Sequence, residues 1–261
     1  MTSPKLIVAY LVWAPSGTGY MRAYLDAYRE HAARAAHDLH LIYNGFESDS
    51  QRQEFDAVAA SPPHTKFETN GSVLDLEAYR QLVTSTDADY YLFLGSYTRP
   101  LVDGWLELLL RHQRSPEVGM VAPSGSYESI SSGAPLATRL FRLTQFPAFP
   151  NPHLRTGAFM IQRDVINRMR WPKVRTKLDA WKLENGRRSF SAQVQALGLK
   201  TVVAGADGVA YEWPDWPKSN TFRSGEQENL VIADNRTDDW QSADTDERAK
   251  LSRLAWGSGE Q

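Results

Sequence analysis

The first half of the chain alternates between short, mostly apolar runs and longer stretches whose apolar residues recur at helical spacing. The short runs predict strands at residues 5–13, 39–43, 66–69, 90–94 and 118–122. The stretches between them predict helices at residues 20–34, 50–60, 74–84 and from Trp105 onward. Strands that alternate with helices predict an α/β fold with a doubly wound, mostly parallel central sheet of the Rossmann-like kind, flanked by helices.

The second half of the chain is more irregular. Residues 124–152 are rich in turn-forming residues and proline, and the pattern after them predicts strands at 155–162 and 201–204 and helices at 164–169, 178–184 and 189–197. No repeat or linker separates two domains. We therefore expect one domain over residues 1–237, with halves at 5–123 and 124–237, and a weakly docked polar tail at 238–261.

Turn-forming residues follow several of the predicted strands. The run at 90–94 ends in Gly95-Ser96-Tyr97-Thr98, and Arg99-Pro100 prevents the strand from continuing. Ligands of doubly wound sheets bind outside the carboxyl ends of the strands. Trp13, Asn44 and Gly95 are therefore predicted to lie at the edge of the sheet that forms the site.

Composition narrows the class of protein. A net charge of −2 gives no indication of nucleic-acid binding, and the absence of cysteine excludes disulfides and thiolate sites. No transmembrane segment is predicted, because no stretch is long and apolar enough to span a bilayer. The first residues lack the basic start of a secretory signal, so we expect a cytoplasmic protein. The sequence leaves a homo-oligomer open.

Three segments together resemble a known family. They are Tyr-Leu-Phe-Leu-Gly-Ser-Tyr-Thr-Arg-Pro-Leu at 91–101 with Gly-Trp-Leu at 104–106, Thr-Gly-Ala-Phe-Met-Ile-Gln-Arg-Asp at 156–164, and Asp-Ala-Trp-Lys-Leu-Glu at 179–184 before a helix ending in Gly198. In order and pattern, residues 5 to 210 resemble the A-type glycosyltransferases of the inverting family-two kind. The resemblance implies a nucleotide-sugar-binding half at 5–123 and an acceptor half at 124–237. It also implies sugar transfer from a nucleoside-diphosphate sugar to a carbohydrate or other hydroxyl acceptor.

The chain departs from the family where a metal would bind. The second aspartate of the family's Asp-x-Asp clamp is replaced by Tyr97, and a phenol is a poor ligand for Mg²⁺ or Mn²⁺. Asp87-Ala-Asp89 precedes the strand and lies about 20 Å from the expected site, so we interpret it as a turn. No metal site or cofactor is predicted. We expect metal-independent transfer, with Mn²⁺ or Mg²⁺ left open.

The resemblance also assigns the catalytic base. An inverting transfer needs one carboxylate to deprotonate the acceptor hydroxyl. The first candidate is Glu184, which is followed by Asn185 where the family has aspartate, and the second is Asp179. The plain alternative for both is a solvated carboxylate on a short helix.

Donor and acceptor residues follow from the predicted edge and the resemblance. Without a metal, the diphosphate must be held by hydroxyls, backbone N–H groups and arginines, whose planar fork fits phosphate. The donor and nucleotide candidates are Trp13, Pro15, Asn44, Asp75, Gly95, Ser96, Tyr97, Arg99, Arg187 and Arg188. The acceptor candidates are His153, Tyr211 and Trp213. Packing or surface solubility is the alternative at each position, and a pairing with Asp103 is the alternative for Arg99.

Two other functions stay open. One is a sugar- or nucleotide-binding protein on the same fold that lost catalysis with its metal clamp. The other is a nucleotidyltransferase, although Pro15-Ser-Gly-Thr-Gly19 lacks the basic residues expected after the first strand of that class.

Overall fold

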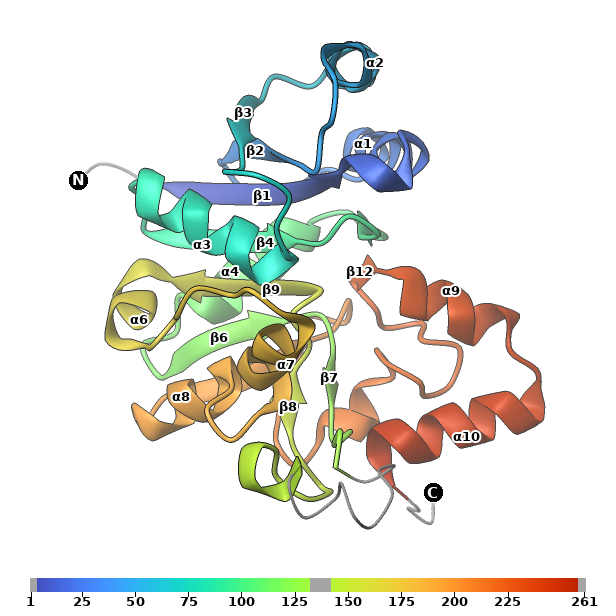
Figure 1. Cartoon of the computed structure of the whole chain (residues 1–261). Coiled ribbons are helices and arrows are strands. Elements are labelled where there is room, and N and C mark those ends of the chain that lie inside the picture. Colours follow the sequence, from blue (N-terminus) through green and yellow to red (C-terminus); the bar gives the residue numbers. More distant parts are fainter. Residues whose placement is uncertain (1–3, 132–141, 258–261) are drawn as a thin grey trace.

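An eight-stranded sheet runs through the molecule (Figure 1). The computed structural model describes residues 4–131 and 142–257. The strands are β1 (Leu6–Trp13), β2 (Asp38–Asn44), β3 (Thr65–Glu68), β4 (Tyr90–Leu94), β6 (Val118–Ala122), β9 (Ala158–Gln162), β10 (Lys200–Ala204) and β11 (Ala210–Glu212), in the order β11-β10-β6-β9-β4-β1-β2-β3. Only β9 and β11 run antiparallel to their neighbours. The predicted mostly parallel α/β sheet is confirmed.

Helices cover both faces of the sheet. One face carries α1 (Gly19–Glu30), α2 (Asp49–Val58) and α4 (Trp105–Gln113), and the other carries α3 (Asp75–Ser85), α6 (Arg163–Arg168), α7 (Lys177–Asn185) and α8 (Phe190–Ala196). Successive residues of a strand point to opposite faces, so Val8 and Tyr10 of β1 enter one core while Ile7 and Ala9 enter the other. A strand buried on both sides explains the uninterrupted apolar run in the sequence.

Two predicted elements differ from the structure. The helix predicted at 20–34 ends at Glu30, because the carbonyls of Ala32 and Ala33 accept hydrogen bonds from Gly104 N and Glu107 N near the start of α4. The strand predicted at 155–162 begins later, as β9 at Ala158, and the residues just before the predicted range form β8 (His153–Leu154), which pairs with β7 (Gly125–Ser126).

The residues after Asp238 are more ordered than a weakly docked tail. They form α9 (Asn235–Ser242) and α10 (Thr245–Trp256), drawn in red in Figure 1. The Trp240 indole is buried and donates to Gly225 O at 3.1 Å, and the Trp256 indole donates to Phe222 O at 2.8 Å. These two tryptophans anchor a segment whose overall composition is polar.

A second, two-stranded sheet brings the C-terminal segment to the end of β4. It joins β5 (Arg99–Pro100) to β12 (Ile232–Ala233). Two short 3₁₀ helices, η1 (Ala14–Ser16) and η2 (Trp216–Ser219), and a helical turn at residues 142–145 lie outside the sheets. None of the described helices is long and apolar enough to cross a membrane. The part of the loop prediction that falls on residues 132–141 lies outside the described residues.

Gly119 tests the packing of α8 on β6. A Cβ at this position would lie 2.6 Å from Val194 Cγ1 and 3.0 Å from Leu199 Cβ, whereas a Cβ at Gly19 in α1 meets nothing within 4 Å. We expect Gly119→Ala to lower the free energy of unfolding by roughly 1–3 kcal/mol. Gly19→Ala is the control and should leave it unchanged or slightly raised. Urea unfolding of both variants measures this, and equal midpoints would contradict the packing.

Candidate active site

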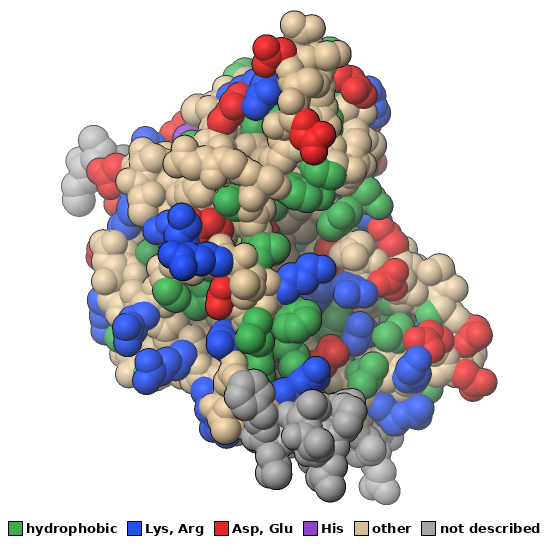
Figure 2. Space-filling model, in the orientation of Figure 1, with side chains coloured by type: hydrophobic (Ala, Val, Ile, Leu, Met, Phe, Trp, Pro, Cys, Tyr) green, Lys and Arg blue, Asp and Glu red, His purple; other side chains and the backbone are tan. Residues whose placement is uncertain are grey.

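A cleft of about 450 Å³ opens at the carboxyl ends of β1 and β4. Figure 2 shows the surface hollowed where Figure 1 places the end of β4 beside β12. Because β9 is antiparallel, the residues that precede it lie at this edge too, opposite α7. The polar and glycine residues that line the cleft are Asn44, Asp75, Gly95, Ser96, Tyr97, Thr98, Arg155, Thr156, Gly157, Lys177, Glu184, Asp234 and Asn235, and Trp13 lies among the apolar ones.

The end of β4 forms a tight turn against the start of β9. Gly95 N donates to Gly157 O at 2.8 Å, and a Cβ on Gly95 would lie only 3.2 Å from that oxygen. Thr98 closes the turn by donating its N–H and its hydroxyl to Gly95 O. The Ser96 hydroxyl is buried and has no hydrogen-bond partner among the described residues. Tyr97 is partly exposed and its ring packs edge-on against Tyr20.

One side of the cleft is built on β1 and β2. The Trp13 ring covers Gly45, whose Cβ would fall 2.7 Å from it. Asn44 is buried; its amide donates to Val73 O and accepts from Val73 N, so it shapes the 71–74 loop with groups that are already engaged. Pro15 packs beside Trp13 over Gly45 but does not line the cleft.

Two carboxylates, those of Asp75 and Glu184, line the cleft, and the charge of Glu184 acts on Asp75. Glu184 Oε1 accepts a hydrogen bond from Thr156 N at 3.1 Å, which fixes the carboxylate at the end of α7. The pKa of Asp75 is raised to about 6, mainly by burial and also by the negative charge of Glu184, while a hydrogen bond from Leu76 N opposes the rise. Asp75 therefore keeps its proton to a higher pH than an ordinary aspartate does.

His153 lies behind this pair. It is 3% exposed, does not line the cleft, and its Nδ1 lies 2.8 Å from Asn151 O. Burial lowers the pKa of His153, while the nearby charge of Glu184 opposes that shift. His153 therefore interacts electrostatically with Glu184 from the protein interior and not from the cleft.

Several cleft residues were not predicted from the sequence. Arg155 forms an ion pair with Asp234 at 2.8 Å and stacks over the Phe222 ring at 4.2 Å. Lys177 lies two turns before Glu184 on the same side of α7. The helix was predicted to begin at Leu178, so this spacing was missed. The Arg155–Asp234 ion pair could not be predicted from the sequence, because its two residues lie far apart along the chain.

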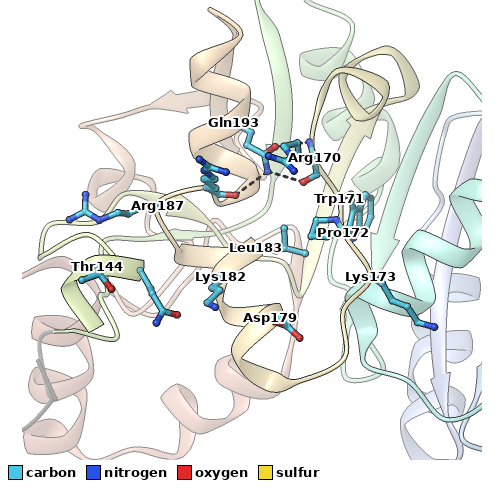
Figure 3. Close-up of a pocket in the computed structure, with 12 residues that line it drawn as sticks. Thr144, Arg170, Trp171, Pro172, Lys173, Asp179, Lys182, Leu183, Arg187 and Gln193 are labelled. Carbon is cyan, nitrogen blue, oxygen red and sulfur yellow. Dashed lines mark hydrogen bonds between the residues drawn. The ribbon is translucent and has the colours of Figure 1, made fainter. Parts of the chain in front are cut away.

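Three predicted residues lie on the other side of α7. Asp179, Arg187 and Arg188 line a separate groove, shown in Figure 3. The Asp179 carboxylate closes a capping box with Thr176, and Arg187 donates two hydrogen bonds to Leu143 O. Neither arginine lines the cleft at the end of β4.

The remaining predicted residues also lie outside the cleft. Arg99 pairs with Asp238 at 2.6 Å rather than with Asp103. Tyr211 donates to Asp207 at 2.6 Å and belongs to β11, the edge strand at the far end of the sheet from β3. Trp213 follows β11 and is 55% exposed.

The acidic side chains of the cleft are not gathered into a group of three or more among the described residues. Within residues 4–131 and 142–257, no group of three or more histidines, aspartates or glutamates is arranged to hold an ion. Asp234 is occupied by Arg155 and by the first turn of α9. Asp89, from the Asp-x-Asp sequence, accepts from Lys5 N just before β4 begins, at the opposite end of the strand from the cleft.

Among solved structures, the chain is similar to the mannosyltransferase PcManGT from Pyrobaculum calidifontis, determined in complex with GDP-Man and Mn²⁺. The TM-score is 0.51 at 12% identity over 84% of this chain, which spans 60% of the length of that one. The chain has the A-type glycosyltransferase fold. It is also similar to glucosyl-3-phosphoglycerate synthase from Mycobacterium tuberculosis, in complex with Mn²⁺, UDP and phosphoglyceric acid, with a TM-score of 0.43 and 11% identity over 96% of this chain and 75% of that one. No family model and no curated protein matches the sequence.

Because the pKa of Asp75 is raised in the folded protein, ionising this carboxyl lowers the free energy of unfolding, and the loss depends on pH. Below the ordinary carboxyl pKa of about 4, folded and unfolded chains both bind the proton, and no cost arises. Between about pH 4 and pH 6 the unfolded chain ionises first, so stability falls as pH rises, and above about pH 6 the cost is constant. Asp75→Asn should therefore stabilise the protein by roughly 1–3 kcal/mol at about pH 8 and much less near pH 4.5.

Urea unfolding at the two pH values measures this difference. Asp87→Asn removes an exposed carboxylate elsewhere and serves as the control. An Asp75→Asn gain that is equal at both pH values would contradict the assignment.

Proposed function

We propose that this protein is a glycosyltransferase that moves a sugar from a nucleoside-diphosphate sugar to a hydroxyl acceptor, with inversion at the transferred carbon. The observation that carries the proposal is the cleft itself, where a carboxylate fixed at the end of α7 faces the polar turn that ends β4. The A-type fold supports it, since ligands of such sheets bind at this edge. The cytoplasmic location stays a prediction.

Glu184 is the proposed general base. Its carboxylate is held by Thr156 N and partly exposed to the cleft, where it can accept the proton of an acceptor hydroxyl as that oxygen attacks the sugar. A single base at the acceptor hydroxyl suits direct displacement and hence inversion.

The departing diphosphate is proposed to be stabilised without a metal. Lys177 and Arg155 bring positive charge to the cleft, and the Ser96 hydroxyl and the turn after Gly95 offer hydrogen-bond donors. Such preorganised donors stabilise the negative charge that develops on a leaving group. Trp13, at the end of β1, is the proposed platform for the nucleotide base.

The same features favour a second candidate. A cleft without a metal-binding group of side chains also suits a protein that binds a nucleotide sugar and does not turn it over. The following experiment separates the two.

Glu184→Gln should reduce release of nucleoside diphosphate from the donor about 10²- to 10⁴-fold, because the amide cannot accept the proton. The dissociation constant of the nucleoside diphosphate, measured by thermal shift, should change by less than about threefold, since the general base Glu184 lies on the acceptor side. Asp179→Asn, across α7, is the control and should keep turnover within a few-fold. Turnover that Glu184→Gln leaves intact would remove Glu184 from the mechanism. A wild-type protein that binds donor without turnover would favour the second candidate.

Metal independence has its own test. Donor turnover measured in excess EDTA should stay within about twofold of turnover in Mn²⁺, because the cleft side chains supply the positive charge. Loss of turnover in EDTA with recovery in Mn²⁺ would contradict this part of the proposal.

A further inference from the structure

Positive charge is concentrated in one short segment of an acidic chain. Residues 168–188 hold eight basic and two acidic residues, a net charge of +6 in a chain of net −2. None of these eight basic side chains forms an ion pair with a described residue, whereas most of the other described lysines and arginines do. The segment therefore produces a positive electrostatic potential that nearby carboxylates do not neutralise.

Five of these side chains surround a groove of about 840 Å³ (Figure 3). The groove lies between α7, α8, residues 170–173 and residues 144–145, and Trp171 and Leu183 provide apolar lining. Its basic side chains are Arg170, Lys173, Lys182, Arg187 and Arg188. The only carboxylate in its lining is Asp179, whose Oδ2 accepts hydrogen bonds from Arg175 N, Thr176 N and the Thr176 hydroxyl. It is thus already engaged within the chain.

One glutamine holds the basic segments together. Gln193 Oε1 accepts from Arg170 N at 2.7 Å, and Gln193 Nε2 donates to Arg170 O at 3.2 Å and to Arg188 O at 3.0 Å (Figure 3). All three bonds are made to backbone atoms, which leaves both guanidinium groups available. The backbones of two arginines are thus held on the same glutamine, and neither guanidinium forms an ion pair with a described residue.

The outer side of α7 adds exposed apolar side chains. Leu178 is 39% exposed and Trp181 is 44% exposed, and both lie between Lys177 and Lys182 on the helix. Tryptophan and leucine flanked by basic residues are typical of a helix that lies at the surface of a membrane. A binding site for a small anion would not need this apolar pair.

We propose that the α7 face, defined as the basic groove together with Leu178 and Trp181, docks on a bilayer that contains anionic phospholipid. The basic side chains would contact the phosphate headgroups, and Leu178 and Trp181 would enter the interface. Trp181 lies less than one turn before Glu184, so docking brings the cleft close to the membrane surface. The inference goes beyond the proposed function and does not depend on it.

Vesicle sedimentation of the full chain tests the docking. Vesicles of phosphatidylcholine alone are compared with vesicles containing about 30% phosphatidylglycerol, in about 0.1 M and 0.5 M salt. We expect at least tenfold stronger partitioning onto the anionic vesicles at the lower salt, because exposed charges are screened at the higher. The double variant Arg170→Glu with Arg188→Glu should lose most of the preference for anionic over neutral vesicles at the lower salt. The matched control, Arg22→Glu with Arg114→Glu, changes two exposed arginines on α1 and after α4 and should stay within about twofold.

A second variant pair separates a bilayer from a soluble anion. Leu178→Ser with Trp181→Ser should weaken vesicle binding several-fold without removing any charge. Thermal melting checks that each variant folds, and Lys173→Gln with Lys182→Gln replaces the double glutamate variant if that one unfolds.

Three outcomes would overturn the proposal: equal binding to both kinds of vesicle, equal loss in the control pair, or displacement from vesicles by millimolar glycerophosphate. Tighter binding to single-stranded RNA than to anionic vesicles would also overturn it.

Discussion

The close contact between Gly95 and Gly157 is the constraint on which the site depends. The Gly95 N–H meets Gly157 O at 2.8 Å, at the point where β4 leaves the sheet and β9 enters it. A side chain on Gly95 would press on that oxygen and separate the two segments. The contact places Thr156 next to the turn, and Thr156 N in turn holds Glu184. The turn, the antiparallel strand and the carboxylate therefore form one connected unit.

Helix α7 divides the chemistry of this half of the molecule. Lys177 and Glu184 face the cleft, whereas Asp179, Lys182 and Leu183 face the basic groove. The helical period of 3.6 residues explains the division, since positions two turns apart share a side and those between them do not. The carboxylates at 179 and 184 consequently have different surroundings although they are close in sequence. One is engaged in a cap and the other faces the site.

The local pattern predicted much of the fold and only part of the site. The runs at β1 and β4 could be identified because a strand buried on both faces must be apolar throughout. Trp13, Asn44, Asp75, Gly95, Ser96, Tyr97 and Glu184 were all placed at the cleft from strand ends and the resemblance. The detailed role of Asn44 was not predictable, because its partner Val73 lies on another loop.

Contacts between residues far apart in the sequence explain why some side chains were assigned to the wrong place. Arg99 was assigned to phosphate, but it meets Asp238 on α9, 139 residues away. The Arg155–Asp234 pair likewise depends on β12 returning to β5. The helices after Asp234 were missed because two tryptophan indoles, bonded to Gly225 O and Phe222 O, hold them in place rather than a long apolar stripe.

The central claim is that the cleft at the end of β4 is the nucleotide-sugar site. A crystal structure with the nucleoside diphosphate that most raises the melting temperature tests it most directly. The account predicts the base beside Trp13 and the diphosphate between Gly95 and Lys177, within reach of the Ser96 hydroxyl. A nucleotide bound in the basic groove between α7 and α8, with the cleft empty, would contradict it.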